Sequence, residues 1–241
     1  MPQNSGRTLE IAVESAAGII ACRGLADRIE LCAGLDVGGL TPDIGLMGFA
    51  AASGLETHVL IRPGSGDFTM TAEDVAIARQ SIVAARELGL AGIVIGAERD
   101  GRLDVPALKA MMSAAEGMHV ALHRVIDVLP DPISAVETAI ALGFQRILTS
   151  GGAARAVDGI ETLNAMQAHS AGRIEIMAGG GISASTLPTL MRETAITSFH
   201  ASCRRSDPVP PKYGALGFGA ANRSIDRDEL ARLAGMLRPE D

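Results

Sequence analysis

Eight short apolar runs recur along the chain, and each is followed by a segment of helical or loop character. Their starts lie about 27 residues apart on average, close to the ~30 residues of one strand–helix–strand unit. A regular alternation of strand and helix predicts a parallel sheet, because each helix carries the chain back to the same edge. The runs span residues 9–14, 28–32, 57–62, 92–97, 119–124, 146–151, 173–179 and 197–203.

Several of the intervening segments carry helix start and stop signals. The pair Thr41-Pro42 predicts a helix that begins at the proline, since proline suits the first helical position. Thr71, followed three residues later by Asp74, is typical of a capping box. Further signals are a start at Asp131-Pro132, stops at Gly89 and Gly143, a cap at Ser183 or Ser185, and a last helix over 226–238.

Eight such units in 241 residues favour an α/β fold in which the strands close into a (β/α)8 TIM barrel, a single domain that usually has ~250 residues. The competing fold is an open, doubly wound sheet. The first apolar run lacks the G-x-G-x-x-G turn that a dinucleotide-binding sheet of that kind would show. We therefore expect a flexible tail over residues 1–8 and a barrel domain over 9–241.

Composition narrows the choice of partners. The formal net charge is −7 and the chain has no basic run, which argues against a nucleic-acid surface. No stretch approaches the roughly 20 apolar residues that a membrane span needs, so no membrane partner is expected either. With five Phe, one Tyr and no Trp, the core must be built from aliphatic side chains.

The three cysteines are Cys22, Cys32 and Cys203, and this odd, small number does not suit a disulfide framework. Free thiols fit a reducing compartment, and the first residues lack the apolar core of a signal peptide. These features predict a cytoplasmic protein.

In such a barrel the chemistry lies where the strands end. A buried carboxylate without a partner is costly, so each glutamate on a strand should meet a cation from another strand. Both strand glutamates could equally be structural, and a lone strand histidine is more often a satisfied core residue. The candidates near the strand ends are Glu10, Glu30, Cys32, Arg62, His123, Arg124, Asp127, Ser150, His200 and Ser202.

The stretch His-Arg-Val-Ile-Asp at 123–127 concentrates chemistry at the end of the fifth run. We expect His123 or Glu30 to act as general acid or base, a role that needs a pKa near neutrality. Asp127 would then orient or charge His123. The three residues identify this stretch as the main candidate for a catalytic element.

Two features predict a small anionic ligand. Arg62 precedes a glycine-rich loop, and its guanidinium fork suits a carboxylate or phosphate. Gly180 and Gly181 follow the seventh run and are expected to open a helix whose free amides cradle an anion. Ser202, with Arg204 and Arg205, would complete this cradle. Alternatively, the glycines make only a tight turn.

The sequence is also compatible with a metal site. Cys32 could offer a thiolate, the kind of ligand that Cu(I) prefers. The chain contains no C-x-x-C or H-x-x-x-H spacing, so such a site would have to be assembled in space.

Several segments together resemble the copper homeostasis protein CutC family, and they occur in the family's order: residues 28–42, 61–68, 123–127, 143–152, 176–182 and 199–202. The resemblance implies a cytoplasmic, often oligomeric TIM barrel associated with Cu(I) binding. It implies that the pocket is lined by residues matching Glu10, Glu30, Arg62, His123, Arg124, Asp127, Ser150 and His200.

The chain departs from the family at Ala12, where many relatives carry a cysteine proposed as a Cu(I) ligand, and Cys32 is left as the metal candidate. Three functions remain open: a Cu(I)-binding homeostasis protein, an enzyme acting on a small phosphorylated or sugar-like anion, and a binding protein without catalysis. The resemblance also implies a homo-oligomer, most simply a dimer.

Overall fold

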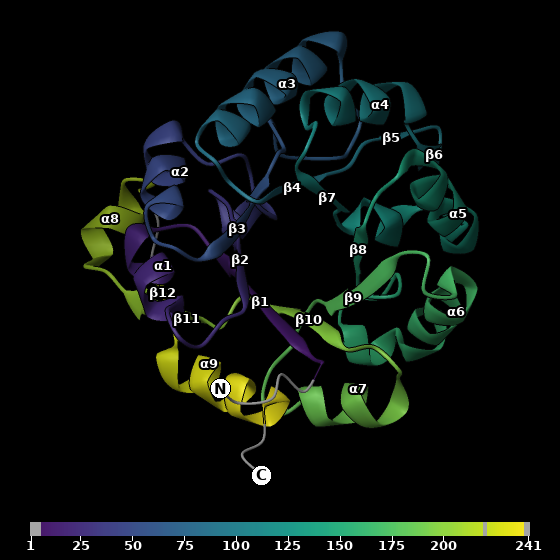
Figure 1. Ribbon diagram of the computed structural model, residues 1–241. Helices are drawn as coiled ribbons and strands as arrows, with labels where there is room; N and C mark the ends of the chain where they lie inside the picture. The colour runs from purple at the N-terminus through teal and green to yellow at the C-terminus, as the bar shows by residue number, and fades with distance from the viewer. Residues whose placement is uncertain (1–5, 219–220, 239–241) are drawn as a thin grey trace.

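The computed structural model describes residues 6–218 and 221–238; the start of the expected tail, residues 1–5, lies outside the described residues. Eight parallel strands close into a barrel, which confirms the predicted (β/α)8 fold (Figure 1). The first strand pairs with both the second and the last, so the sheet has no free edge. The strands are β1 (Thr8–Val13), β2 (Arg28–Leu31), β3 (Glu56–Leu60), β4 (Gly92–Ile95), β7 (His119–Leu122), β8 (Arg146–Thr149), β9 (Glu175–Gly179) and β10 (Ser198–Ala201).

Helices surround the barrel in Figure 1, and the main core fills the space between them and the strands. Strand alternation decides which side chains join it. Leu9 and Ile11 of β1 belong to this core, whereas Glu10 between them turns to the barrel interior. The helices are α1 (Ala16–Cys22), α2 (Ile44–Ala51), α3 (Ala72–Glu87), α4 (Val105–Ala114), α5 (Pro132–Leu142), α6 (Ile160–Ser170), α7 (Leu187–Glu193) and α9 (Arg227–Leu237).

The capping predictions hold at some helices and fail at others. The capping box of Thr71 and Asp74 is present at the start of α3, and Asp131 caps α5. The helix expected to begin at Pro42 begins instead at Ile44, because the side chain of Asp43 takes the capping position. Neither predicted serine caps α7, which starts at Leu187 without a side-chain cap.

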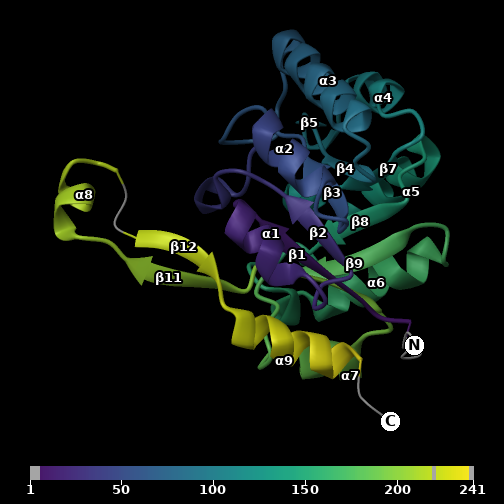
Figure 2. The same cartoon turned by 60° about the vertical axis from the view of Figure 1, so that its left-hand side comes forward.

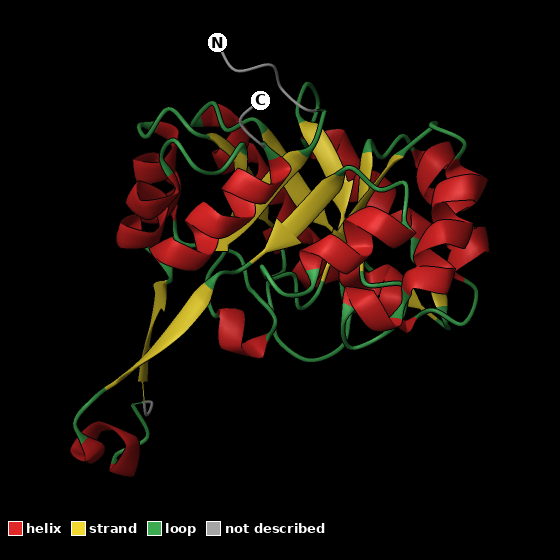
Figure 3. Ribbon diagram, turned by 90° about the horizontal axis from the view of Figure 1, so that it is seen from below, coloured by secondary structure: helices red, strands yellow, loops and turns green. Residues whose placement is uncertain are grey.

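A long hairpin arm leaves the barrel after β10. It consists of β11 (Arg204–Pro208), α8 (Pro211–Ala215) at the tip and β12 (Ala221–Ile225), and it leads into α9. Figures 2 and 3 show it projecting away from the helices and strands of the barrel. The sequence pattern did not predict this arm. A second, much shorter hairpin joins β5 (Glu98–Arg99) to β6 (Arg102–Leu103).

Across the described ranges, none of the helices combines the length and the apolar character that crossing a bilayer requires.

Candidate functional site

A cavity of about 260 Å³ opens at the mouth of the barrel, where the strands end. It has an apolar wall that includes Leu60, Phe68 and Leu148. Predicted site residues among its lining are Glu30, Arg62, His123, Arg124, Gly180, Gly181, His200 and Ser202. The other four, Glu10, Cys32, Asp127 and Ser150, lie behind this surface, where they hold or contact the lining residues.

A chain of four charged groups runs from inside the barrel to the cavity. Glu10 accepts a hydrogen bond from Arg28 with one carboxylate oxygen, and its other oxygen lies 2.8 Å from Nδ1 of His200. Nε2 of His200 in turn lies 3.7 Å from a carboxylate oxygen of Glu30, which lines the cavity. Strand register creates this chain, since Glu10 lies opposite Arg28 on β2 and His200 on β10. The expectation that Glu10 meets a cation from another strand is therefore met.

The chain sets the protonation of each member. Burial alone would raise the pKa of Glu10, but the hydrogen bond with His200 and the charge of Arg28 bring it well below its usual range. Burial opposes protonation of His200, yet its hydrogen bond to Glu10 and the nearby carboxylates raise its pKa. Burial raises the pKa of Glu30, and the charge of His200 offsets part of that rise. Glu30 is thus a carboxyl that can hold a proton at the cavity surface.

Arg62 brings an uncompensated positive charge to the same cavity. Its side chain donates to three backbone carbonyls, those of Val37 at 3.0 Å, Gly39 at 2.9 Å and Gly66 at 2.7 Å. It lies over the ring of Phe68, 5.1 Å from the centroid. Only 7% of the residue is exposed, and its Nε has no hydrogen-bond partner among the described residues. Within that same part of the chain no carboxylate forms an ion pair with Arg62, so a bound anion would balance its charge.

His123 is a neutral hydrogen-bond donor. Its Nδ1 accepts a hydrogen bond from the backbone N–H of Val125 at 3.1 Å, which places the ring proton on Nε2. That Nε2 is buried and without a partner in the described residues. Burial, reinforced by the charge of Arg62, lowers the pKa of His123 to about 3. The pKa of His123 therefore lies far from the near-neutral value expected of a general acid or base, whereas the pKa of Glu30 is shifted upward from its usual value.

Asp127 has a structural role that the sequence did not predict. It accepts hydrogen bonds from Thr149 Oγ1 at 2.5 Å, from the backbone and hydroxyl of Ser150 at 3.0 and 2.9 Å, and from the backbone of Gly152 at 3.1 Å. It also accepts from Nε of Arg124 at 2.7 Å. The expected pairing of Asp127 with His123 is wrong, since Nδ1 of that ring is taken by a backbone amide.

Ser150 lies behind the cavity wall and helps to hold Arg124, which lines the cavity. Nη2 of Arg124 donates to Oγ of Ser150 at 2.7 Å, and the single proton of this hydroxyl has two acceptors in reach, the carboxylate of Asp127 and the carbonyl oxygen of Ala153 at 2.5 Å. With Nε fixed by Asp127, the guanidinium of Arg124 has a defined orientation toward the cavity that it lines.

The glycine run does not open a helix as expected. Gly180 and Gly181 have φ of 99° and 69°, which glycine adopts without strain, and α7 begins only at Leu187. The two residues form a tight turn that lines the cavity. Of the two arginines expected nearby, Arg204 lines the cavity and pairs with Asp36, whereas Arg205 is exposed and pairs with Asp207.

The residues of the site do not fit Cu(I) well. Cys32 is fully buried, its Sγ lies 3.5 Å from a carboxylate oxygen of Glu30, and burial raises the pKa of the thiol well above its usual value. Ala12 lines the cavity without a donor atom. Over residues 6–218 and 221–238, no group of three or more His, Cys, Asp or Glu side chains is placed to hold a metal ion. Soft donors therefore do not converge at this site in the described part of the chain.

Sequence reasoning missed a second polar layer deeper in the barrel. Arg28 also lies 3.6 Å from Glu56, and Arg146 donates to Glu175 at 2.8 Å. His58 and His119 stack beside this layer with ring centroids 4.8 Å apart. Arg28 could have been found from the sequence, because it stands two residues before Glu30 and strand alternation puts both on one face.

Comparison with known proteins places the chain among well-defined relatives. Residues 7–205 match the model of the CutC family. A "family protein CutC" from Agrobacterium fabrum is 44% identical over 234 residues, which cover 95% of this chain and 93% of that protein. One from Sinorhizobium medicae is 44% identical over 231 residues, covering 95% and 94%. The crystal structure of the "Putative Copper Homeostasis Protein CutC" from Streptococcus agalactiae superimposes with a TM-score of 0.78 at 29% identity, covering 81% of this chain and 98% of that one.

Proposed function

The chain belongs to the CutC family, and we propose that its barrel mouth binds a small phosphorylated or sugar-like anion and transfers a proton to or from it. The observation that carries this proposal is Arg62, a buried guanidinium that is held by backbone carbonyls and lacks a carboxylate partner among the described residues. A buried charge of this kind is costly unless a counterion joins it, so the cavity favours an anion.

The neighbours of Arg62 supply the remaining contacts for such a ligand. Nε2–H of His123 is a buried donor that needs an acceptor, and Arg124 adds a second, oriented guanidinium. Hydrogen bonds to a phosphate or carboxylate from charged donors are roughly twice as strong as those between neutral groups. The apolar wall of Leu60, Phe68 and Leu148 would exclude water from the less polar part of the ligand.

Glu30 supports the proton-transfer step. Its pKa is raised above the usual value of a carboxyl, the direction that a general acid needs, and it stands at the cavity surface next to His200. His200, whose protonated form Glu10 favours, would donate its Nε2 proton to the carboxylate of Glu30 after Glu30 has protonated the ligand, and the neutral ring would then be free to take a proton back. In this proposal His123 binds and polarises the ligand, and Asp127 acts by positioning Arg124.

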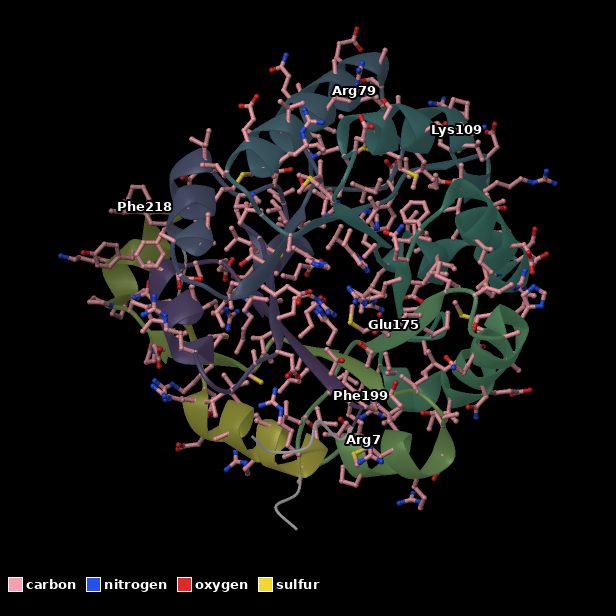
Figure 4. All side chains as sticks on the ribbon, viewed as in Figure 1. Arg7, Arg79, Lys109, Glu175, Phe199 and Phe218 are labelled. Carbon is pink, nitrogen blue, oxygen red and sulfur yellow. The ribbon has the colours of Figure 1, made fainter. Side chains whose placement is uncertain are left out.

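The binding half of the proposal is tested by thermal shift and calorimetry with inorganic phosphate and a panel of sugar phosphates. Phosphate or a sugar phosphate should stabilise wild type in the thermal-shift assay. Arg62→Ala should bind the same compound with at least tenfold lower affinity by calorimetry. The matched control is Arg79→Ala, because Arg79 is exposed on α3 at the rim of the molecule (Figure 4). Absence of stabilisation in wild type by every compound, or equal binding by Arg62→Ala, would contradict the proposal.

Cu(I) is the alternative ligand, supported by the copper homeostasis name of the Streptococcus agalactiae relative and by the thiol of Cys32 beside Glu30. Cu(I) competition against a chromogenic chelator tests it. Cys32→Ala should abolish stoichiometric binding, whereas Cys22→Ala, which removes another buried thiol, should not. Equal binding by wild type and Cys32→Ala would rule out copper at this site.

All three cysteines are buried free thiols, which supports the proposed cytoplasmic location, where thiols stay reduced.

A further inference from the structure

Arg62 and Arg124 lie on opposite sides of the barrel mouth. Arg62 follows β3, and its guanidinium donates to the carbonyl of Gly39 in the loop after β2. The guanidinium of Arg124 lies instead beside β8 and β9, because it donates to Ser150 and a methyl group on Gly180 would lie 3.5 Å from its Cζ. Two strands separate the pair β2 and β3 from the pair β8 and β9 in either direction around the barrel (Figure 1). The cavity therefore has two cationic sides that face each other.

On the Arg62 side, two buried N–H groups lack an acceptor among the described residues. They are Nε–H of Arg62 and Nε2–H of His123. Both side chains contact Phe68: Cζ of Arg62 lies 5.1 Å from the ring centroid, and the ring of His123 lies 4.8 Å from it. A carboxylate or phosphate has several acceptor oxygens, so one such group can satisfy both N–H groups and balance the charge of Arg62.

The Arg124 side also has free donor capacity. Asp127 accepts from Nε of Arg124 and Ser150 accepts from Nη2, whereas Nη1 has no hydrogen-bond partner within the described part of the chain. The turn of Gly180 and Gly181, both with positive φ, lines the cavity beside this guanidinium. Backbone N–H groups in such turns form concavities that bind anions. A second acidic group therefore fits here.

The part of the mouth between these two sides is suited to an uncharged chain that undergoes proton transfer. Glu30 and His200 stand on β2 and β10, the two neighbours of β1, and their side chains are 3.7 Å apart. Leu60 and Leu148 give this cavity an apolar wall. Its volume of about 260 Å³ is below the ~300–1,000 Å³ of pockets for drug-sized ligands. A ligand that reaches both cationic sides is therefore a short chain.

We propose that the ligand of this cavity is a short dianion with one acidic group, a carboxylate or a phosphate, at each end. One end lies against Arg62 and His123 and the other against Arg124. The inference rests on the proposed function and narrows the ligand from a small anion to a two-ended one. A ligand with a single charged end leaves one cationic side without an acceptor, whereas a chain held at both ends keeps its middle next to Glu30. Inorganic phosphate, which is smaller, can occupy either side separately.

Calorimetry on the full-length protein with two matched compounds tests the proposal. 3-Phosphoglycerate has a phosphate and a carboxylate at its two ends, and glycerol 3-phosphate has the same phosphate and chain length but an alcohol in place of the carboxylate. Wild type should bind 3-phosphoglycerate about tenfold or more tightly than glycerol 3-phosphate, because only the former makes charge-assisted hydrogen bonds on both sides.

Arg62→Ala and Arg124→Ala should each abolish this preference, since either variant can hold only one charged end. The matched control is Arg205→Ala, which removes an exposed arginine that pairs with Asp207, and it should keep the preference of wild type. Circular dichroism melting shows whether each variant is folded, and the wild-type comparison of the two compounds needs no variant.

Equal affinity of wild type for the two compounds would overturn the two-ended ligand and leave the proposed anion site standing. Absence of binding by both compounds, together with absence of binding by inorganic phosphate, would overturn the proposed function as well. A preference for 3-phosphoglycerate that survives in both Arg62→Ala and Arg124→Ala would also contradict the inference, because the second acidic group would then bind elsewhere.

Discussion

Nδ1 of His200 lies 2.8 Å from a carboxylate oxygen of Glu10, although the two residues are almost at opposite ends of the barrel sequence. The closing pair of strands, β1 and β10, sets them in register. The pairing of β1 with β10 therefore both closes the barrel and brings Glu10 to His200. Through this contact it favours the protonated form of the histidine next to Glu30.

Glu10→Gln should destabilise the protein by about 3–5 kcal/mol, since it removes the buried carboxylate that pairs most closely with the buried guanidinium of Arg28. The same change should lower the pKa of His200, because the main group that favours its charged form is removed. Urea unfolding measures the first effect and NMR titration of the histidine the second. The control Glu56→Gln removes a half-exposed partner of Arg28 and should cost less than ~1 kcal/mol. Equal losses in the two variants would contradict the central role of Glu10.

The free energy of unfolding should fall on the acid side of pH 6.5. The pKa of His123 is lowered from 6.5 to about 3, so between these values the unfolded chain binds more protons than the folded one. Stability should drop by about 1.4 kcal/mol for each pH unit in that window. His119, whose pKa is lowered to about 4, adds a smaller term because it is only partly buried. Urea unfolding of His123→Gln should show a shallower acid slope than wild type, and an unchanged slope would contradict this assignment.

Above pH 6.5 the free energy of unfolding should fall as the pH rises. The pKa of His200 is raised above 6.5, so its contribution is fully present below that pH and is lost as the pH rises through the folded value. Glu30, whose pKa is also raised, acts in the same direction from 4.5 upward. His200→Gln should flatten the alkaline fall seen in urea unfolding without changing the acid limb. A variant that loses the acid limb instead would show that the two histidines have exchanged roles.

The strands and the members of the cavity could be predicted because both follow from local pattern. A parallel barrel buries its strands on both faces, so they appear as short apolar runs, and its chemistry lies at their ends. The partner of Glu10 could not be predicted from such a local sequence pattern. Whether it meets Arg28, Arg62 or His123 depends on the register between strands, which becomes visible only when β1 lies against β2 and β10.

Two other features were beyond the sequence for different reasons. His123 and Asp127 stand four residues apart and suggest a pair, but the short 3-10 helix Arg124–Val128 turns the carboxylate toward Ser150 and away from the ring. The arm at 204–225 contains proline and glycine and few apolar alternations, so its strands carry no clear signal. Its pairing depends on contacts between its two strands, and the apolar side chains of Leu216 and Phe218 near its tip are exposed.

Asp127→Ala should cost about 3 kcal/mol or more in urea unfolding, because a buried carboxylate that satisfies Thr149, Ser150 and Arg124 is lost. The pKa of His123 should stay low, since burial and the charge of Arg62 lower it and Asp127 does not contribute. The control Asp158→Ala removes an exposed partner of Arg155 and should leave stability nearly unchanged. If Asp127→Ala instead raised the pKa of His123 in an NMR titration, the catalytic pairing predicted from the sequence would be restored.

Gly180→Ala should weaken both the fold and the binding of phosphate. The residue has φ of 99°, and a methyl group on it would lie 3.2 Å from Cβ of Ser150 and 3.5 Å from Cζ of Arg124. The backbone strain should cost about 1–3 kcal/mol. The close contact with Ser150 should displace the hydroxyl that accepts a hydrogen bond from Arg124, so the guanidinium loses part of its fixed orientation toward the cavity. The control is Gly172→Ala. Gly172 has φ of 75° and nothing lies within 4 Å of an added methyl group, so this variant has the backbone strain without a steric contact. Urea unfolding should show losses in both variants, whereas calorimetry with phosphate should show weaker binding in Gly180→Ala alone. Equal phosphate affinity in the two variants would mean that Arg124 does not contribute to the anion site.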